Sequence, residues 1–193
     1  MNYLQDTVVL VLGLGESGLA MARWCAGLGA SVRVWDSRAS ADSTPALGAA
    51  LAEHVPAAVW LRGALGDEAL DGVKLVLKSP GLSPFDPAIA PLLQRAAAMG
   101  LPIQGELDLF ARALVDLKAE RGYEPKLLAI TGTNGKTTTT AMTAQLINRT
   151  GRRAVAAGNI GPTMLQTLAD ALAAEPVGEG MVVEEPIAIE PVE

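Results

Sequence analysis

Apolar residues gather in short runs along the first part of the chain, and each run ends at a glycine or a polar turn. Residues 7–12 (Thr-Val-Val-Leu-Val-Leu) form a continuous apolar run, and residues 31–35 and 72–78 are rich in valine and leucine. Such runs are typical of strands that are covered on both faces, as in a parallel sheet. Shorter runs at 57–61 and 101–104 predict two further strands.

Longer segments between these runs predict helices. Residues 19–28 are mostly apolar and end at Gly29, residues 87–99 end at Gly100, and residues 106–120 are amphipathic. A further helix is predicted to begin at Pro45, with Ser43 or Thr44 as its N-cap. The regular alternation of strand and helix predicts an α/β fold with a parallel sheet.

A glycine turn follows the first predicted strand. Gly13, Gly15 and Gly18 have the spacing of a dinucleotide-type fingerprint, and Asp36 ends the next strand about 20 residues later. In a nicotinamide enzyme Asp36 would bind the ribose hydroxyls, whereas a different nucleotide contact could instead include the following Ser37 and Arg38. A turn that serves only close helix–strand packing is the alternative. The segment 79–84 lies at the carboxyl end of another strand, where doubly wound sheets bind ligands.

A second glycine turn precedes a helix that is predicted to begin at Lys136. Residues 127–130 are predicted as a buried strand, and the turn of 132–135 follows it. Backbone N–H groups and the helix dipole favour a phosphate here; Lys136 would reach the β- and γ-phosphates, and Thr137 would bind Mg²⁺. Ile130 stands where the full Walker pattern has a glycine, so a simple structural turn remains the alternative.

The domain boundary is predicted near residues 121–125, which are polar and contain glycine and proline. We expect a first domain at 1–122, a partial second domain at 123–175 and an acidic, disordered tail at 176–193. The second domain is predicted to contain a helix to about Asn148, a strand at 153–157 and a helix at 162–174. Two strands form at best a marginal sheet, so the sequence resembles the front part of a longer protein.

Composition narrows the classes of function. The net charge is −6, and no basic stripe is interleaved with aromatic residues, which argues against nucleic-acid binding. No apolar run approaches the ~20 residues of a membrane span, and no signal region precedes the first strand. The single cysteine, Cys25, excludes an internal disulfide and fits a reducing compartment, so a cytoplasmic protein is expected. The only histidine, His54, is interpreted as a surface or packing residue.

Six motifs occur along the chain in a specific order. They are Gly13-Leu-Gly-Glu-Ser-Gly18, Asp36-Ser-Arg38, Ser79-Pro-Gly81, Gly105-Glu-Leu-Asp-Leu-Phe110, Gly132-Thr-Asn-Gly-Lys-Thr-Thr138 and Gly158-Asn-Ile-Gly161. In this order and spacing the chain resembles the Mur ligases of peptidoglycan synthesis over residues 5–174. Within that family, the third and fourth motifs favour the member that adds D-glutamate.

The resemblance implies a Rossmann-like parallel-sheet domain that holds the UDP of a UDP-sugar, followed by the start of a P-loop α/β domain that binds ATP. The implied substrate-binding residues are Gly15, Glu16, Ser17, Gly18, Asp36, Ser37, Arg38, Ser79, Pro80, Gly81 and Asn159. The implied ATP-binding residues are Gly132, Thr133, Asn134, Gly135, Lys136, Thr137 and Thr138. Glu16 departs from the small or apolar residue expected in the turn, because a carboxylate beside a diphosphate is unfavourable unless it points away.

The implied reaction uses ATP and Mg²⁺. The γ-phosphoryl group activates the carboxylate of UDP-N-acetylmuramoyl-L-alanine as an acyl phosphate, and the amine of D-glutamate then attacks it. Lys136 is the implied catalytic residue, which offsets charge on the transferred group, and Thr137 the implied Mg²⁺ ligand. The family's further metal ligands and its amino-acid-binding domain have no counterpart here, so we expect a truncated, monomeric chain that is inactive alone. A nicotinamide-dependent oxidoreductase and a non-catalytic nucleotide-binding module are the alternatives.

Overall fold

Five parallel strands form the sheet of this protein, whose structure is a computed structural model describing residues 3–38, 45–159 and 161–174. The strands are β1 Val8–Leu12, β2 Ser31–Trp35, β3 Val59–Leu61, β4 Val73–Lys78 and β5 Ile103–Gln104. Their order in the sheet is β3-β2-β1-β4-β5, and every neighbouring pair is parallel. The predicted α/β, Rossmann-like sheet is therefore confirmed, with all five strands where the apolar runs placed them.

The continuous apolar run in β1 reflects burial on both faces of the sheet. Val9 and Val11 enter one hydrophobic core, whereas Leu10 and Leu12 enter a second core on the opposite face. All four side chains are fully buried. Because successive strand residues point to opposite faces, a strand between two helical layers needs an apolar residue at every position.

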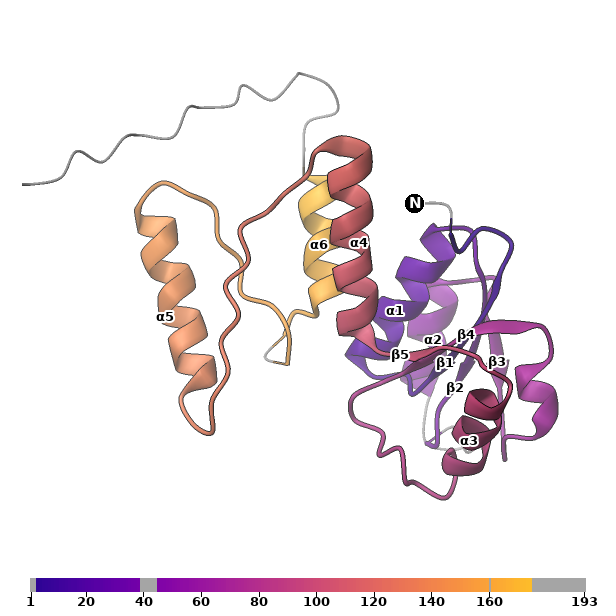
Figure 1. The fold of residues 1–193 in the computed structure, drawn as a ribbon. Helices are drawn as coiled ribbons and strands as arrows, with labels where there is room; N and C mark the ends of the chain where they lie inside the picture. The colour runs from indigo at the N-terminus through magenta and orange to yellow at the C-terminus, as the bar shows by residue number, and fades with distance from the viewer. Residues whose placement is uncertain (1–2, 39–44, 160, 175–193) are drawn as a thin grey trace, which may run out of the picture.

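Helices cover both faces of the sheet (Figure 1). Helices α1 Glu16–Gly27, α2 Pro45–His54 and α4 Glu106–Arg121 contribute to the core that contains Val9. Helix α3 Ala90–Ala98 and the short 3-10 helix Asp67–Leu70 contribute to the other core. The four α-helices were all predicted, although α1 begins three residues earlier and α3 three residues later than expected. The 3-10 helix was not predicted. The residues predicted to cap α2 lie outside the described part of the chain.

The two strands predicted in the second part of the chain do not form. Residues 127–130 and 153–157 have no strand conformation, and Leu127 and Leu128 are 61% and 64% exposed. The prediction of a buried strand at 127–130 is therefore wrong for this chain, as is that of a strand at 153–157. A strand is stable only when neighbouring strands satisfy its backbone groups and cover its apolar face, and neither segment has such a neighbour among the described residues.

Helix α5 Lys136–Arg149 lies apart from the sheet, whereas helix α6 Met164–Ala173 packs on α1 and α4 (Figure 1). No residue of α5 is buried. In α6, Leu165 joins the core beside Leu109, and Leu168 packs with the buried face of α4. The described residues thus form a packed body, made of residues 3–121 with α6, and a projecting segment, residues 124–158.

The predicted division at residues 122 and 123 stays a prediction. Helix α6 falls in the predicted second domain by sequence, yet its apolar face packs on α1 and α4 of the first. The predicted acidic tail at 176–193 lies outside the described residues. No helix in the described ranges combines the length and hydropathy that a bilayer span requires.

Candidate functional site

The glycine turn after β1 contains one glycine that the fold does not need. A Cβ atom on Gly18 would lie 1.8 Å from the carbonyl oxygen of Gly13, so only glycine lets α1 approach β1 this closely. Gly13 itself has a φ of +89°, which favours glycine. Gly15 has an ordinary φ of −81°, and a Cβ atom there would meet nothing within 4 Å. The open space at Gly15, at a helix N-terminus with no side-chain cap, is suited to an anionic ligand.

Asp36 is joined to this turn and to Arg38 by four hydrogen bonds. Its Oδ2 atom accepts from the Leu14 N–H (2.6 Å) and from Arg38 Nη2 (2.9 Å). Its Oδ1 atom accepts from the backbone N–H and the Nε of Arg38, both at 2.9 Å. Asp36 is 4% exposed, so the carboxylate is a fixed part of the structure that holds both the turn and the Arg38 side chain.

These bonds determine the charge and the chemistry of Asp36. The guanidinium of Arg38 and the two backbone N–H groups lower the pKa of Asp36 to about 2, against the opposing effect of burial. A carboxylate has about four acceptor positions, and all are used within the protein. Asp36 is therefore poorly placed to bind ribose hydroxyls, as it would in a nicotinamide enzyme.

The loop after β4 packs against the turn after β1. The Ser79 N–H donates to the Leu12 carbonyl (2.9 Å), and a Cβ atom on Gly13 would lie 2.9 Å from the Cβ of Ser79. Lys78 Nζ donates to the carbonyl oxygens of Ser79 and Leu82, which closes the loop. Ser79 is buried, whereas Pro80 and Gly81 are exposed. After β1 the chain continues to β2 and β3 on one side of the sheet, and after β4 it continues to β5 on the other side. The loop after β4 therefore lies at the topological switch point, where such folds bind ligands.

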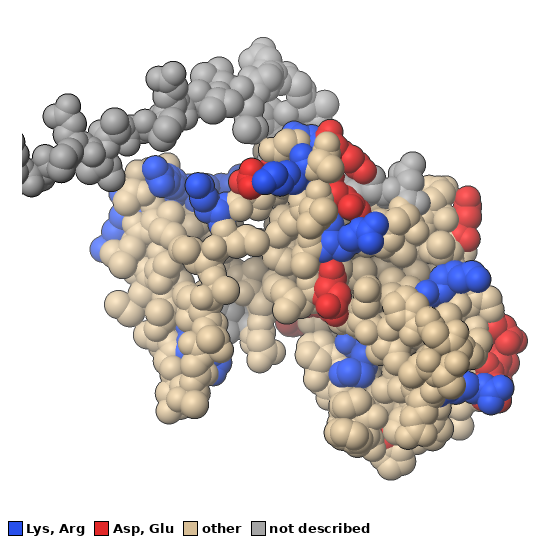
Figure 2. All heavy atoms as spheres, in the orientation of Figure 1, with Lys and Arg blue, Asp and Glu red and all other residues tan. Residues whose placement is uncertain are grey.

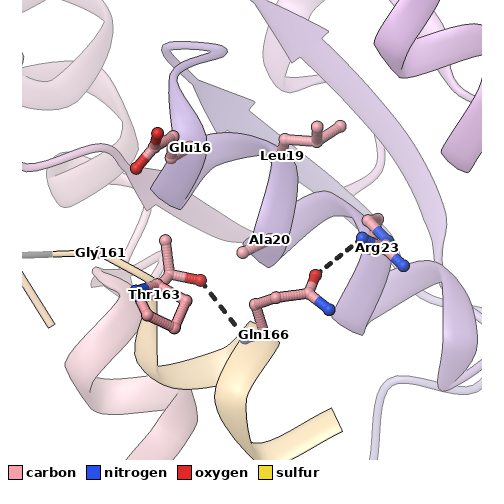
Figure 3. Close-up of a pocket in the computed structure, with 8 residues that line it drawn as sticks. Glu16, Leu19, Ala20, Arg23, Gly161, Thr163 and Gln166 are labelled. Atoms are coloured by element: carbon pink, nitrogen blue, oxygen red, sulfur yellow. Dashed lines mark hydrogen bonds between the residues drawn. The ribbon is translucent and has the colours of Figure 1, made fainter. Parts of the chain in front are cut away.

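Beside this turn a cavity of about 360 Å³ lies between α1 and the N-terminal end of α6 (Figure 3). It is lined by Glu16, Leu19, Ala20, Arg23, Gly161, Pro162, Thr163 and Gln166. Arg23 Nη1 donates to Gln166 Oε1 (2.7 Å) across one side of the cavity, and the Thr163 hydroxyl accepts from the Gln166 N–H (3.3 Å). The cavity brings Glu16 of the first glycine turn beside Gly161 of the 158–161 motif. Its hydrogen bond from Arg23 to Gln166 spans 143 residues of sequence.

Glu16 lies on the wall of this cavity and faces the second loop. Its Oε2 atom is 3.8 Å from the position of a Cβ atom on Gly161. The carboxylate is therefore directed toward the 161 loop, while the backbone of the turn remains available for a phosphate. Ser17 is half-buried in the first turn of α1, and Asn159 is exposed in the 158–161 loop.

The second glycine turn has the local geometry of a phosphate loop. Gly135 is the N-cap of α5 with a φ of +74°, and no side chain caps this helix. The Lys136 ammonium folds back over the turn and donates to the carbonyl oxygens of Gly132 and Thr133. Thr137 and Thr138 are exposed in the first helical turn. An uncapped helix N-terminus beside a lysine and two hydroxyls suits the phosphates of a nucleotide.

The fit to Mg²⁺ is only partial. Thr137 supplies a hydroxyl at the expected position, but the described residues contain no cluster of three His, Cys, Asp or Glu side chains that could hold a metal ion. A hard divalent cation at this loop would need oxygen ligands from the nucleotide phosphates and from other groups.

The structure brings four of the predicted groups together and leaves the fifth apart. The first glycine turn, Asp36–Arg38, Ser79–Gly81 and the 158–161 loop meet around the carboxyl edge of the sheet. The phosphate loop precedes α5, in the projecting segment (Figure 1). Residues Lys78, Arg23 and Gln166 were not predicted, because each lies in a regular element and only the fold brings it to the site. For Lys78, the sequence offered one signal, which is the position of a lysine at the carboxyl end of a predicted buried strand.

Comparison with protein families agrees with these motifs. The family description "Mur ligase MurD-like, N-terminal domain" matches residues 7–105, which is 99 of the 193 residues. The description "Mur ligase middle domain" matches residues 130–183. The chain belongs to the Mur ligase family.

Among curated Mur ligases, the chain is similar to proteins named UDP-N-acetylmuramoylalanine–D-glutamate ligase. It is 52% identical over 186 residues to the protein from Albidiferax ferrireducens, covering 95% of this chain and 36% of that relative. It is 51% identical over 181 residues to the protein from Ralstonia nicotianae, again covering 36% of the relative. The chain thus spans about a third of the length of these Mur ligases.

Among solved structures, the chain resembles a shikimate dehydrogenase from Aquifex aeolicus. The TM-score is 0.42 at 19% identity, covering 64% of this chain and 51% of that one.

Proposed function

We propose that this chain is the part of a D-glutamate-adding Mur ligase that binds UDP-N-acetylmuramoyl-L-alanine and presents the phosphate loop for ATP. The curated relatives carry the name of this ligase, and they support D-glutamate as the second substrate. The observation that carries the proposal is the turn at Gly15, which is open, uncapped and free of any packing reason for glycine.

The residues of the packed body would bind the UDP-sugar in the following way. The backbone N–H groups at the start of α1 would bind the diphosphate, aided by the positive end of the helix dipole. Arg38, held in place by Asp36, and the loop from Ser79 to Gly81 would surround the uridine end. The sugar-peptide would extend toward the cavity between α1 and α6, near Asn159 in the 158–161 loop.

The phosphate loop would bind the triphosphate of ATP. ATP supplies the phosphoryl group that activates the carboxylate of the sugar-peptide. Lys136 would exchange its bonds to the carbonyl oxygens of Gly132 and Thr133 for the nucleotide phosphates, and so offset their charge. Thr137 would contribute a hydroxyl ligand to Mg²⁺.

The scope of the proposal follows the length of the chain. The ligase reaction is proposed for a protein of the length of the relatives, acting in the cytoplasm. For the 193 residues alone we expect binding without turnover, because the described residues contain no cluster of three His, Cys, Asp or Glu side chains that could complete a Mg²⁺ site beside Thr137. The predicted domain division at 122 and 123 is part of the same proposal.

Calorimetric titration of the chain with UDP-N-acetylmuramoyl-L-alanine, and separately with NAD⁺, tests the first ligand. We expect binding of the UDP-sugar and none of NAD⁺, since Asp36 is saturated by internal bonds. Binding of NAD⁺ alone would overturn the proposal in favour of an oxidoreductase.

Titration with ATP in the presence of Mg²⁺ tests the second ligand. Lys136→Ala should abolish measurable nucleotide binding, because the ammonium is the one cation of the loop. Lys126→Ala is the matched control, since Lys126 is exposed and lies before the turn. Equal effects of the two substitutions would show that the loop does not act through Lys136.

A further inference from the structure

Glu106 is a buried carboxylate that connects two distant parts of the chain. It is the first residue of α4 and is only 6% exposed. Its Oε1 atom accepts a hydrogen bond from the Leu165 N–H at 2.9 Å, across 59 residues of sequence. Leu165 is the second residue of α6, so the carboxylate satisfies one of the backbone donors that a helix leaves unpaired at its N-terminus.

Glu106 connects the N-terminal ends of two helices. It is the first residue of α4, and its carboxylate bonds to the first turn of α6. The preceding Gly105 directly follows β5, which pairs with β4 at the edge of the sheet. Glu106 is thereby attached to the rim of the sheet on one side and to α6 on the other.

Helix α6 in turn fixes the loop that faces the first glycine turn. Gly161, Pro162 and Thr163 lead directly into α6 and line the cavity opposite Glu16. Within the loop, the Gly158 N–H donates to the Pro162 carbonyl and the Gly161 N–H to that of Gly158. These bonds connect Gly158 and Gly161 to the residues that begin α6. The first turn of α6 is in turn bonded to Glu106.

Glu106 does not line the cavity itself. Any effect on a ligand must pass through the Leu165 N–H and the position of α6. The side-chain hydrogen bond from Arg23 in α1 to Gln166 in α6 is formed by exposed groups and is expected to stabilise the position of α6 less than the Glu106 bond does.

We propose that Glu106 is a positioning residue that holds the 158–163 loop across the cavity, so that a ligand extending from the Gly15 turn is bound between the two segments. The proposal rests on the proposed function, in which the UDP end contacts the turn and the sugar-peptide end extends toward the loop. Glu106 should therefore affect the affinity for the whole UDP-sugar and leave that for UDP unchanged.

The test compares two ligands on variants of the full 193-residue chain. Glu106→Ala should weaken UDP-N-acetylmuramoyl-L-alanine binding about tenfold, because a hydrogen bond to a charged acceptor is lost, and change UDP binding less than about twofold. Glu106→Gln keeps an acceptor oxygen and should restore most of the affinity. Asp108→Ala is the matched control, since Asp108 is exposed in the same helical turn and, among the described residues, its side chain bonds within the turn to the Gly105 N–H (2.8 Å) and not to α6.

If Glu106→Ala bound UDP and the UDP-sugar more weakly by the same factor, the substitution would have caused a general loss of structure, and the proposal would be overturned. Unchanged affinity of Glu106→Ala for the UDP-sugar would also overturn it. If that variant does not fold, Glu106→Asp carries the same comparison, because its carboxylate is too short by one methylene to reach Leu165.

Hydrogen exchange separates this proposal from the function on which it rests. The amides of residues 158–166 should exchange faster in Glu106→Ala than in the parent chain, while those of β1 and β4 should not change. If the parent chain bound neither ligand, the proposed function would fail, and exchange at 158–166 would still decide whether Glu106 positions the loop. Unchanged exchange there would overturn the positioning role.

Discussion

The two glycine turns of this chain have similar local sequences and very different surroundings. The turn after β1 is fixed by tertiary contacts, because Gly18 touches the Gly13 backbone, Asp36 holds the Leu14 N–H, and Ser79 packs beside Gly13. The turn before α5 is held by its own backbone and by Lys136, and no residue of the helix that follows is buried. One site is thus built by the fold, and the other by local geometry alone.

The distribution of apolar side chains shows the same contrast. Among the described residues, no buried hydrophobic side chain lies between Leu117 and Leu165. The projecting segment instead exposes large apolar residues, which are Leu127, Leu128, Met142, Leu146 and Val155. In Figure 2 most of the visible surface of this segment carries no charged side chain. Secondary structure in this region therefore depends on partners that the packed body does not provide.

The largest expected effect is that of Gly18→Ala. The new Cβ atom would lie 1.8 Å from a backbone oxygen, so α1 must move away from the sheet. We expect a loss of about 4 kcal/mol in the free energy of unfolding, measured by denaturant titration of tryptophan fluorescence. Gly15→Ala is the matched control and should cost about 0.5 kcal/mol while weakening UDP-sugar binding. If the two substitutions were equally destabilising, the assignment of separate structural and binding roles would be wrong.

A pair of leucine substitutions compares the two regions directly. Leu77→Ala removes a fully buried side chain from β4 and should lower the free energy of unfolding by about 3 kcal/mol. Leu128→Ala removes a side chain that is 64% exposed and should change it by less than about 0.5 kcal/mol. A large cost at Leu128 would mean that the projecting segment is packed in solution.

The pH dependence of stability tests the Asp36–Arg38 pair. The folded-state pKa of Asp36, about 2, is below the ordinary value of 3.8, so its stabilising contribution is complete above about pH 4 and is lost as the pH falls toward 2. The contribution is about 1–2 kcal/mol, reduced from the full shift because the Arg38 side chain is 57% exposed.

Asp36→Asn should remove this contribution at neutral pH. In the variant, the free energy of unfolding should fall less steeply between pH 4 and pH 2 than in the parent chain. If the free energy of unfolding fell equally steeply with pH in the two proteins, the lowered pKa of Asp36 would not be the cause of the pH dependence.

The smallest expected effect concerns the exposed contact between α1 and α6. Arg23→Ala removes the bond to Gln166 and should lower the free energy of unfolding by no more than about 0.5 kcal/mol. Arg149→Ala, in the last turn of α5, is the control and should have no measurable effect in the same denaturant titration. A loss above about 1.5 kcal/mol at Arg23 would show that the contact is a main support of α6.

The difference between the regions also explains how far the sequence could predict the structure. The five strands and the first glycine turn were predicted correctly, because burial on both faces of a sheet imposes a continuous apolar pattern that local sequence records. Residues 127–130 have the same apolar pattern but form no strand, since their neighbours are not among the described residues.

Glu16 and Gly161 lie in predicted motifs, but the other polar residues of the cavity could not be predicted, for a different reason. Arg23 and Gln166 belong to regular helices, Thr163 is the N-cap of α6, and none of the three lies in a motif. Glu106 lies in the motif of residues 105–110, which did not indicate its contact with α6. Their shared role depends on α6 returning to pack on α1 and α4, which is a tertiary contact that spacing along the chain does not encode.

The most direct test of the central claim is hydrogen exchange of the 193-residue chain with and without saturating UDP-N-acetylmuramoyl-L-alanine. The site built by the fold should respond, so protection should increase at residues 13–18, 36–38, 79–81 and 158–166. The amides of α5 should exchange at the same rate in both conditions. Protection confined to residues 132–149, with none at the turn after β1, would contradict the claim that the carboxyl edge of the sheet binds the UDP-sugar.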